Sequence, residues 1–206
     1  VVGAVSIPVT VKMRLGWDDA SINAPELARR AEQEGVRMVT IHGRTRQQFY
    51  KGRANWDAIR DVVDAVSIPV VANGDCANAS DAREMLARSG AAAGMVGRAA
   101  TGRPWLPGAI ARALETDEAE AVAPDPHALA ALSADHFSAC VDHYGGDVGV
   151  RTARKHLAAA IEHTLATGCA SDRPHLRRAI LTEPDPDAVL RLLALWFEEI
   201  PEEQAA

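Results

Sequence analysis

The stretch VTVKMRLGW, residues 9–17, begins with the β-branched and apolar residues of a buried strand and carries Lys12 and Arg14 where that strand ends. Side chains two residues apart on a strand point to the same side. Lys12 and Arg14 therefore face together into the space that the end of the strand borders. We interpret them as candidate site residues, and the units that follow along the chain indicate which fold presents them.

Strands and helices alternate along the first half of the chain. We expect strands in IPVTVKMR (7–14), VRMVTIHGR (36–44), IPVVANGD (68–75) and, more weakly, AAAGMVGRAATG (91–102). We expect helices in NAPELARRAEQEG (23–35), NWDAIRDVVDAV (55–66) and NASDAREMLARSG (78–90). Pro25 suits the first turn of the first helix and Gly35 its end, and Ser80 or Asp81 can cap the third. The alternation predicts parallel βαβ units with a buried sheet.

Each apolar run finishes in polar or glycine residues, and in parallel α/β folds ligands bind at the carboxyl ends of the strands. Gly74 and Gly97 provide backbone that a ligand can approach closely, and a helix start that follows would direct N–H groups at an anion. The same glycines would also suit tight turns, but Arg98 favours a phosphate site. The candidate residues at these ends are His42, Gly43, Arg44, Asn73, Gly74, Asp75, Gly97 and Arg98.

Lys12 and His42 lie at the ends of the first two expected strands. Taken singly, Lys12 also suits a strand-end cation with a buried stem, and His42 a structural turn histidine. A reduced flavin ring carries negative charge near N1 and the C2 carbonyl, which a lysine and a histidine donor would stabilise. Together with a phosphate site two strands later, the two residues predict one phosphorylated ligand across the mouth of a barrel.

The composition and the second half of the chain limit the class of protein. The chain has 206 residues, 48% of them hydrophobic, three cysteines and a net charge of -6, which indicates a globular protein in a reduced, cytoplasmic setting and excludes RNA binding by overall charge. No apolar run is long enough for a membrane span. After an acidic, proline-bearing linker (116–126), helical patterns in residues 127–206 predict a small all-helical domain. Its one concentrated basic stretch contains Arg151, Arg154, Lys155 and His156, and the first three share a face if the segment is helical.

The segments PVTVKMRLGWDD, TIHGRTRQQFYKGRANWDAI, IPVVANGDCAN and MVGRAATGRPWL, followed by RTARKHL, resemble the tRNA-dihydrouridine synthase family in order and spacing. The resemblance implies an α/β fold, with residues 1–115 forming the second half of a (βα)8 TIM barrel that binds FMN, followed by a helical tRNA-binding domain. It further implies that NADPH reduces FMN, which then reduces the 5,6 double bond of a uridine in tRNA by hydride transfer from N5 to C6. The target base would leave its stack to reach the flavin.

The resemblance also assigns roles by position. Lys12 and His42 would contact the flavin ring, and Asn73, Gly74, Asp75, Gly97 and Arg98 would form the ribityl and phosphate end. Arg14 and Arg44 would face the uridine and its neighbours. The family's basic tRNA-contacting motif corresponds to Arg151, Arg154, Lys155 and His156, for which a solvated helix face is the alternative.

The chain departs from the family pattern in its first part. The family has four strands before VTVKMR, and its proton-donating cysteine lies in that part. We therefore expect residues 1–206 to be the C-terminal part of an enzyme, inactive or poorly folded alone and without a catalytic residue of its own. Cys76 is interpreted as a small buried thiol.

Two rival functions remain open, and a metal site is weighed against helix packing. The rivals are an FMN-dependent barrel oxidoreductase acting on a small molecule and a non-catalytic RNA-binding remnant. His136, Cys140 and His143 fall at helical offsets, but they lack paired ligand spacing and accompany an apolar stripe. No metal is expected.

Overall fold

The computed structural model describes residues 1–120 and 122–198, which divide into two compact units. The first unit comprises Val1–Ala99 and Leu106–Ala121, and the second comprises Ala100–Trp105 and Val122–Ala206. Residue 121 of the predicted linker and residues 199–206 of the predicted helical domain lie outside the described residues. The short segment Ala100–Trp105, which the sequence placed before the linker, thus groups with the helical unit.

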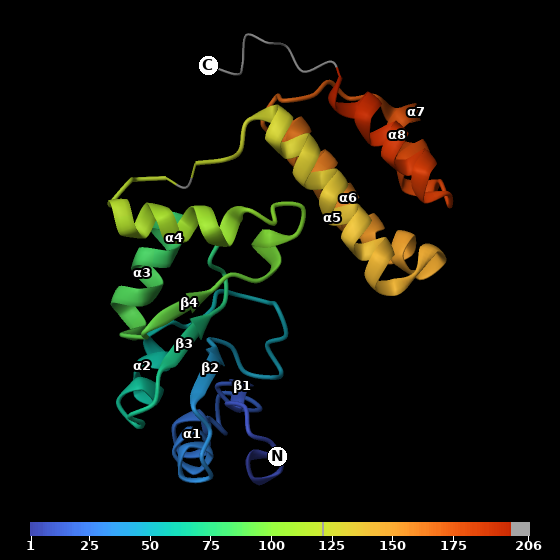
Figure 1. The fold of residues 1–206 in the computed structure, drawn as a ribbon. Coiled ribbons are helices and arrows are strands. Elements are labelled where there is room, and N and C mark those ends of the chain that lie inside the picture. The colour runs from blue at the N-terminus through green and yellow to red at the C-terminus, as the bar shows by residue number, and fades with distance from the viewer. Residues whose placement is uncertain (121, 199–206) are drawn as a thin grey trace. The chain divides into compact units, whose positions relative to one another are not determined.

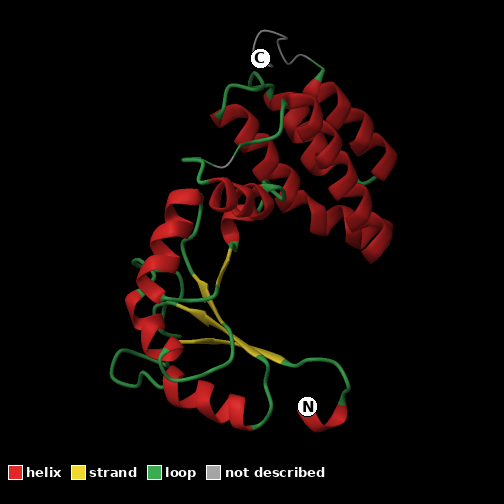
Figure 2. Ribbon diagram, turned by 60° about the vertical axis from the view of Figure 1, so that its left-hand side comes forward, coloured by secondary structure: helices red, strands yellow, loops and turns green. Residues whose placement is uncertain are grey.

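The first unit is a four-stranded parallel sheet with the strand order β1-β2-β3-β4 (Figure 1). Its strands are β1 (Thr10–Arg14), β2 (Met38–His42), β3 (Val70–Asn73) and β4 (Ala93–Met95), and its helices are α1 (Ala24–Gln33), α2 (Asp57–Val63), α3 (Ala79–Ser89) and α4 (Leu106–Thr116), with a 3-10 turn at Val2–Ala4. Consecutive parallel strands joined by right-handed crossovers leave their helices on one face of the sheet. Figure 2 shows α1 to α3 on one side of the strands. This arrangement confirms the predicted α/β class and is that of a segment of a (βα)8 barrel.

Alternation along the strands separates a packed face from an open one. Residues that face the helices form the core with Ile59, Met85 and Ile110, and they are Val11, Met13, Val39, Ile41, Val70 and Ala72. The intervening residues, among them Lys12, Arg14, His42 and Asn73, point to the other face. The cations of β1 therefore belong to the face that carries no helix.

Local signals set most helix boundaries. Pro25 lies in the first turn of α1, and Gly35, with φ 89°, follows its end. The expected cap of α3 was wrong: neither Ser80 nor Asp81 is the cap residue. Asn78 is, and its side-chain oxygen accepts a hydrogen bond from the Asp81 N–H at 2.7 Å.

The second unit is helical and contains α5 (Pro126–Tyr144), α6 (Gly146–Ala166), α7 (Pro174–Thr182) and α8 (Pro186–Phe197). The helical patterns in the sequence are those of residues 127–145, 149–165 and 185–200, which correspond to α5, α6 and α8. They do not separate α7, whose start is marked by Pro174. Trp196 is fully buried in the core of this unit, and its indole Nε1–H donates to the hydroxyl of Thr164 at 3.1 Å. No helix within residues 1–120 or 122–198 combines the length and apolarity needed to cross a membrane.

Candidate functional site

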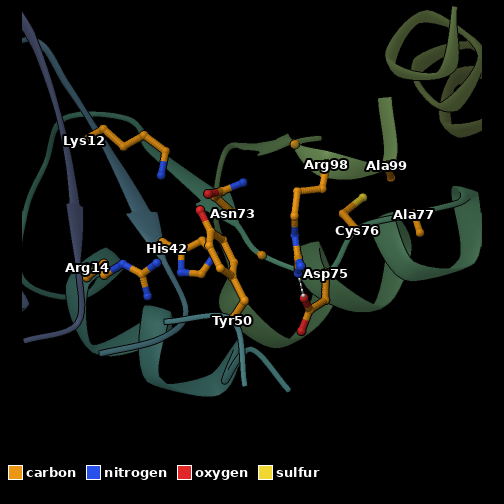
Figure 3. A pocket seen from close by; sticks show the side chains of 12 residues that line it. Lys12, Arg14, His42, Tyr50, Asn73, Asp75, Cys76, Ala77, Arg98 and Ala99 are labelled. Carbon is orange, nitrogen blue, oxygen red and sulfur yellow. Dashed lines mark hydrogen bonds and ion pairs between the residues drawn. The ribbon is translucent and has the colours of Figure 1, made fainter. Parts of the chain in front are cut away.

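The strand ends surround a cavity of about 440 Å³ on the open face of the sheet (Figure 3). Its lining comes from all four strand ends and the loops that follow them. Side chains from positions as far apart in the sequence as 12 and 99 therefore border one cavity. The lining residues are Lys12, Arg14, His42, Tyr50, Asn73, Gly74, Asp75, Cys76, Ala77, Gly97, Arg98 and Ala99. Eight of the nine barrel residues predicted as cofactor or uridine contacts are among them, and Arg44 is the exception.

The register of the sheet explains this convergence. Arg14 pairs with His42, His42 with Asn73, and Asn73 with Met95, so these four residues form one row across the strand ends. Paired residues of neighbouring strands project to the same face. The Asn73 Nδ2–H donates to the Met95 carbonyl at 2.9 Å, which fixes the amide at the centre of the row.

The cavity is electropositive, and its histidine is neutral. Burial lowers the pKa of His42 to about 4, and the charges of Arg14, Lys12 and Arg44 act in the same direction against the opposing charge of Asp75. The imidazole is therefore uncharged near pH 7 and can donate from one ring nitrogen. Burial and the charge of Arg14 likewise lower the pKa of Lys12. Among the described residues the buried Nδ1 of His42 has no hydrogen-bond partner.

Asp75 connects the cavity wall to the loop after β2. Its Oδ2 accepts from the Ala54 N–H at 2.7 Å and from Arg44 at 2.5 Å, and its Oδ1 lies 3.5 Å from an Arg98 nitrogen. Burial raises the pKa of Asp75, but these hydrogen bonds and the two arginine charges outweigh it and hold the pKa below its ordinary value. Asp75 has φ 57°, a conformation that aspartate tolerates better than most residues.

Arg44 does not face the cavity, contrary to the prediction from the sequence. Its side chain is 2% exposed, and its guanidinium donates to the carbonyls of Lys51 and Gly52 as well as to Asp75. The physical reason is that Asp75 and these carbonyls pair with Nε and Nη2 of the buried guanidinium, whose buried Nη1 has no hydrogen-bond partner among the described residues. In this arrangement Arg44 stabilises the loop after β2 and does not reach the cavity in which a base would lie.

Two glycines bring backbone to the cavity. Gly74 has φ 123°, and a Cβ there would lie 2.7 Å from the Ala54 Cβ. Its carbonyl accepts the indole Nε1–H of the buried Trp56 at 2.8 Å. At Gly97 a Cβ would meet only the Asn73 Nδ2, at 3.9 Å, so the absence of a side chain leaves space there. A tight turn therefore accounts for Gly74, whereas Gly97 leaves the wall open to a ligand.

Sequence reasoning missed Tyr50 as a cavity residue. Arg14 lies 5.7 Å and Arg98 lies 4.6 Å from the centre of its ring, so Tyr50 stands between two cations from distant parts of the chain. These distances are typical of cation–π contacts. The available signal was the pair of aromatic residues in the arginine-rich loop after the second strand. Only the folded loop shows which of the two reaches the cavity.

The basic residues of α6 separate into two pairs. Arg151 and Lys155 are exposed one turn apart, and Arg151 and Arg154 line a smaller cavity of about 160 Å³. Arg154 donates to the Thr182 and Glu183 carbonyls at the end of α7, so it is not free on the helix face.

His156, the last of the four basic residues, is half-buried within the helical unit. Its ring packs edge-on against His136 at 4.8 Å. Burial, with the charges of His136 and Lys155, lowers the pKa of His156. Of the predicted motif, Arg151 and Lys155 remain as the exposed pair.

No group of three or more His, Cys, Asp or Glu side chains in the described part of the chain could hold a metal ion. Cys76 is 4% exposed, in agreement with its interpretation as a small buried thiol. Burial and the nearby Asp81 charge raise the pKa of Cys76 to about 11, so it is a thiol rather than a thiolate near pH 7.

Comparisons with known proteins point to one family. The sequence model described as "Dihydrouridine synthase (Dus)" matches residues 1–179. A probable tRNA-dihydrouridine synthase of Rhizobium leguminosarum bv. phaseoli is 48% identical over 188 residues, which cover 91% of this chain and 56% of that protein. One from Rickettsia typhi is 54% identical over 199 residues, covering 97% and 59%. A tRNA-dihydrouridine synthase B of Proteus vulgaris is 41% identical over 200 residues, covering 96% and 59%.

Similarity to solved structures is weak. A mandelate oxidase with 3,3-difluoro-2-hydroxy-3-phenylpropionic acid has a TM-score of 0.33 and 16% identity, over 96% of this chain and 64% of that one. Among the curated relatives described above, the chain spans a little over half of each protein's length.

Proposed function

Because the chain belongs to the dihydrouridine synthase family, we propose that it binds FMN in its cavity and acts in the NADPH-dependent reduction of uridine to 5,6-dihydrouridine in tRNA. The observation that best supports the proposal is the convergence of Lys12, His42, Asn73 and Arg98 on one cavity. The names of the curated relatives, tRNA-dihydrouridine synthases, supply the substrate class. Cytoplasmic localisation is part of the same proposal.

Two observations on the cavity residues are consistent with bound FMN. The orphaned, buried Nδ1 of His42 is a polar atom without a partner among the described residues, which a bound group would satisfy. The space beside Gly97, next to the Arg98 guanidinium, suits a phosphate that must approach backbone closely. Arg98 is 64% exposed at its side chain, so its charge is available to a ligand that enters from solvent.

The chemistry that FMN supplies when bound is transfer of a hydride to the base. Lys12 and the neutral His42 would lie at the ring edge where negative charge develops, and their hydrogen bonds would stabilise it. Arg98 would bind the phosphate. Asp75 is better suited to hold Arg98 than to meet the phosphate, because a carboxylate with a lowered pKa repels an anion. Arg14 would face the uridine, since it lines the cavity between His42 and Tyr50.

In the helical unit we assign tRNA contact to the exposed pair Arg151 and Lys155. Their spacing of four residues places both cations on one stripe of α6, where they can neutralise neighbouring backbone phosphates. Arg154 and His156 would act indirectly by holding α7 and α5 against α6.

The cofactor assignment is tested by titrating the 206-residue chain and its variants with FMN and with riboflavin, which lacks the phosphate. Arg98→Ala should weaken FMN binding about tenfold or more and leave riboflavin binding unchanged, because one charge-assisted phosphate contact is lost. Lys12→Ala should weaken both flavins alike. Arg37→Ala is the matched control, since Arg37 is exposed just before β2, at the opposite end of the sheet. Equal FMN affinity in all variants, or no FMN binding, would exclude the assigned site.

The substrate assignment needs a separate measurement. NADPH oxidation and the mass of tRNA nucleosides should be followed with and without unmodified tRNA, using a protein of the relatives' full length that contains this chain and is loaded with FMN. A gain of two mass units on uridine that depends on NADPH supports the proposal. NADPH oxidation that is the same without tRNA would instead favour a flavin oxidoreductase that acts on a small molecule.

A further inference from the structure

The loops after β1 and β2 carry two exposed aromatic side chains on adjacent backbone. Trp17 is 60% exposed and Phe49 is 51% exposed. The Arg46 N–H donates to the Gly16 carbonyl at 2.8 Å, and the Gln47 N–H donates to the Trp17 carbonyl at 2.9 Å. The two loops are therefore tied together, and we name Trp17, Arg46 and Phe49 the loop surface.

The fold holds Phe49 outward under strain. Its φ is 50°, which a bulky side chain rarely adopts. The Arg14 Nη1–H groups donate to the Thr45 carbonyl at 2.8 Å and to the Phe49 carbonyl at 2.9 Å, so the cavity arginine maintains this conformation. The Arg46 guanidinium lies 4.4 Å from the centre of the Phe49 ring. The exposed ring thus contacts a cation of its own loop, and backbone strain of this kind concentrates at binding sites.

The surroundings of the loop surface are positively charged within an acidic chain. Residues 14–23 and 45–53 contain four cations and two carboxylates, whereas the whole chain has a net charge of -6. The Asp18 carboxylate is engaged within its own loop by the Ala20 N–H and the Ser21 hydroxyl. The surface also continues into the cavity, because Tyr50, the neighbour of Phe49, lines it. The four cations are Arg14, Arg46, Lys51 and Arg53.

We propose that the loop surface binds the nucleotides next to the target uridine, with their bases stacked on Trp17 and Phe49 and a phosphate beside Arg46. This inference rests on the proposed function, which places the uridine in the adjoining cavity. Aromatic faces interleaved with arginine are the means by which proteins hold single-stranded RNA, because every base offers a face for stacking. A polyanion also fits the local excess of cations better than a neutral protein surface does.

The test is fluorescence anisotropy of a labelled single-stranded octaribonucleotide with a central uridine, titrated with the 206-residue chain. Trp17→Ala and Phe49→Gly should each weaken binding about tenfold, the usual loss for one stacked base. Glycine is chosen at position 49 because it adopts the positive φ without strain, so the loop keeps its conformation while the ring is lost. Trp17→Phe should retain affinity. Leu27→Ala is the control for an exposed apolar residue of the same unit, on α1, at 41% exposure.

Affinities of Trp17→Ala and Phe49→Gly within twofold of the wild type, or no binding of the octaribonucleotide by the wild type, would overturn the proposal. Altered sedimentation of these variants with unchanged RNA affinity would do the same, since the surface would then contact protein. FMN titration of the same variants separates this failure from failure of the proposed function. If only the loop surface is wrong, FMN still binds and still depends on Arg98.

Discussion

Replacing Arg44 by alanine should destabilise the first unit far more than removal of an exposed arginine. Arg44 is 2% exposed at its side chain and donates to Lys51, Gly52 and Asp75 at 3.1, 2.6 and 2.5 Å. Removing one partner of a fully buried ion pair costs about 3–5 kcal/mol. The Asp75 side chain is 27% exposed and keeps its bond from the Ala54 N–H, so we expect the lower end, about 3 kcal/mol.

The free energy of unfolding is measured in urea at pH 7 from circular dichroism and tryptophan fluorescence. Arg30→Ala is the matched control, because Arg30 pairs with Glu26 on the surface of α1 and its side chain is 69% exposed. An exposed pair of this kind contributes about 0.5 kcal/mol or less. Equal losses for Arg44→Ala and Arg30→Ala would refute the reasoning, since burial would then not determine the strength of the contact. A double-mutant cycle with Asp75→Asn should show a coupling of about 1.5–3 kcal/mol between the two side chains.

Two further predictions concern the cavity wall. The free energy of unfolding should decline as the pH falls from about 6.5 to about 4, because His42 stays neutral in the folded chain while the unfolded chain takes up the proton. In urea titrations across that range, His42→Gln should remove up to roughly 3 kcal/mol of this decline. The same dependence of the unfolding free energy on pH in the variant and the wild type would contradict the prediction. Gly74→Ala should cost about 2–4 kcal/mol, because its Cβ would lie 2.7 Å from Ala54 at a φ of 123°. Gly52→Ala, at φ 65° in open space, should cost about 1 kcal/mol, and similar losses for both would show that the clash with Ala54 is absent.

Much of the fold follows from apolar runs and their spacing. Apolar residues of β1, β2 and β3 pack toward the helices, so these strands are visible in the sequence, and a helix such as α1 carries its own start and stop residues. The sequence did not resolve α7, because the helix is nine residues long and its apolar pattern is brief. It also misplaced the cap of α3, since the competition among Asn78, Ser80 and Asp81 is decided by the backbone angles of one residue.

The basic residues of α6 show a second limit of prediction from the sequence, namely that a local motif does not give the environment of each side chain. Four basic residues within six positions share a sequence neighbourhood but not an environment, because a helix turns each to a different neighbour. Arg151 and Lys155 remain exposed, while Arg154 binds the end of α7 across a separation of 28 residues. Such long-range partners are not visible in a local pattern. A motif of this kind therefore contains both surface residues and residues that position the helices.

Lys12 and Arg44 show how far the direction of a cavity side chain can be predicted from the sequence. Lys12 lies within β1, where alternation alone assigns its side chain to the open face. β2 ends at His42, and the Arg44 N–H already turns back to the His42 carbonyl at 2.7 Å. Beyond that turn the period of the strand no longer determines direction, and the direction of Arg44 is set by Asp75, 31 residues later. Residues inside a strand can thus be assigned to the cavity from the sequence, whereas the first residues of each loop depend on contacts that only the fold creates.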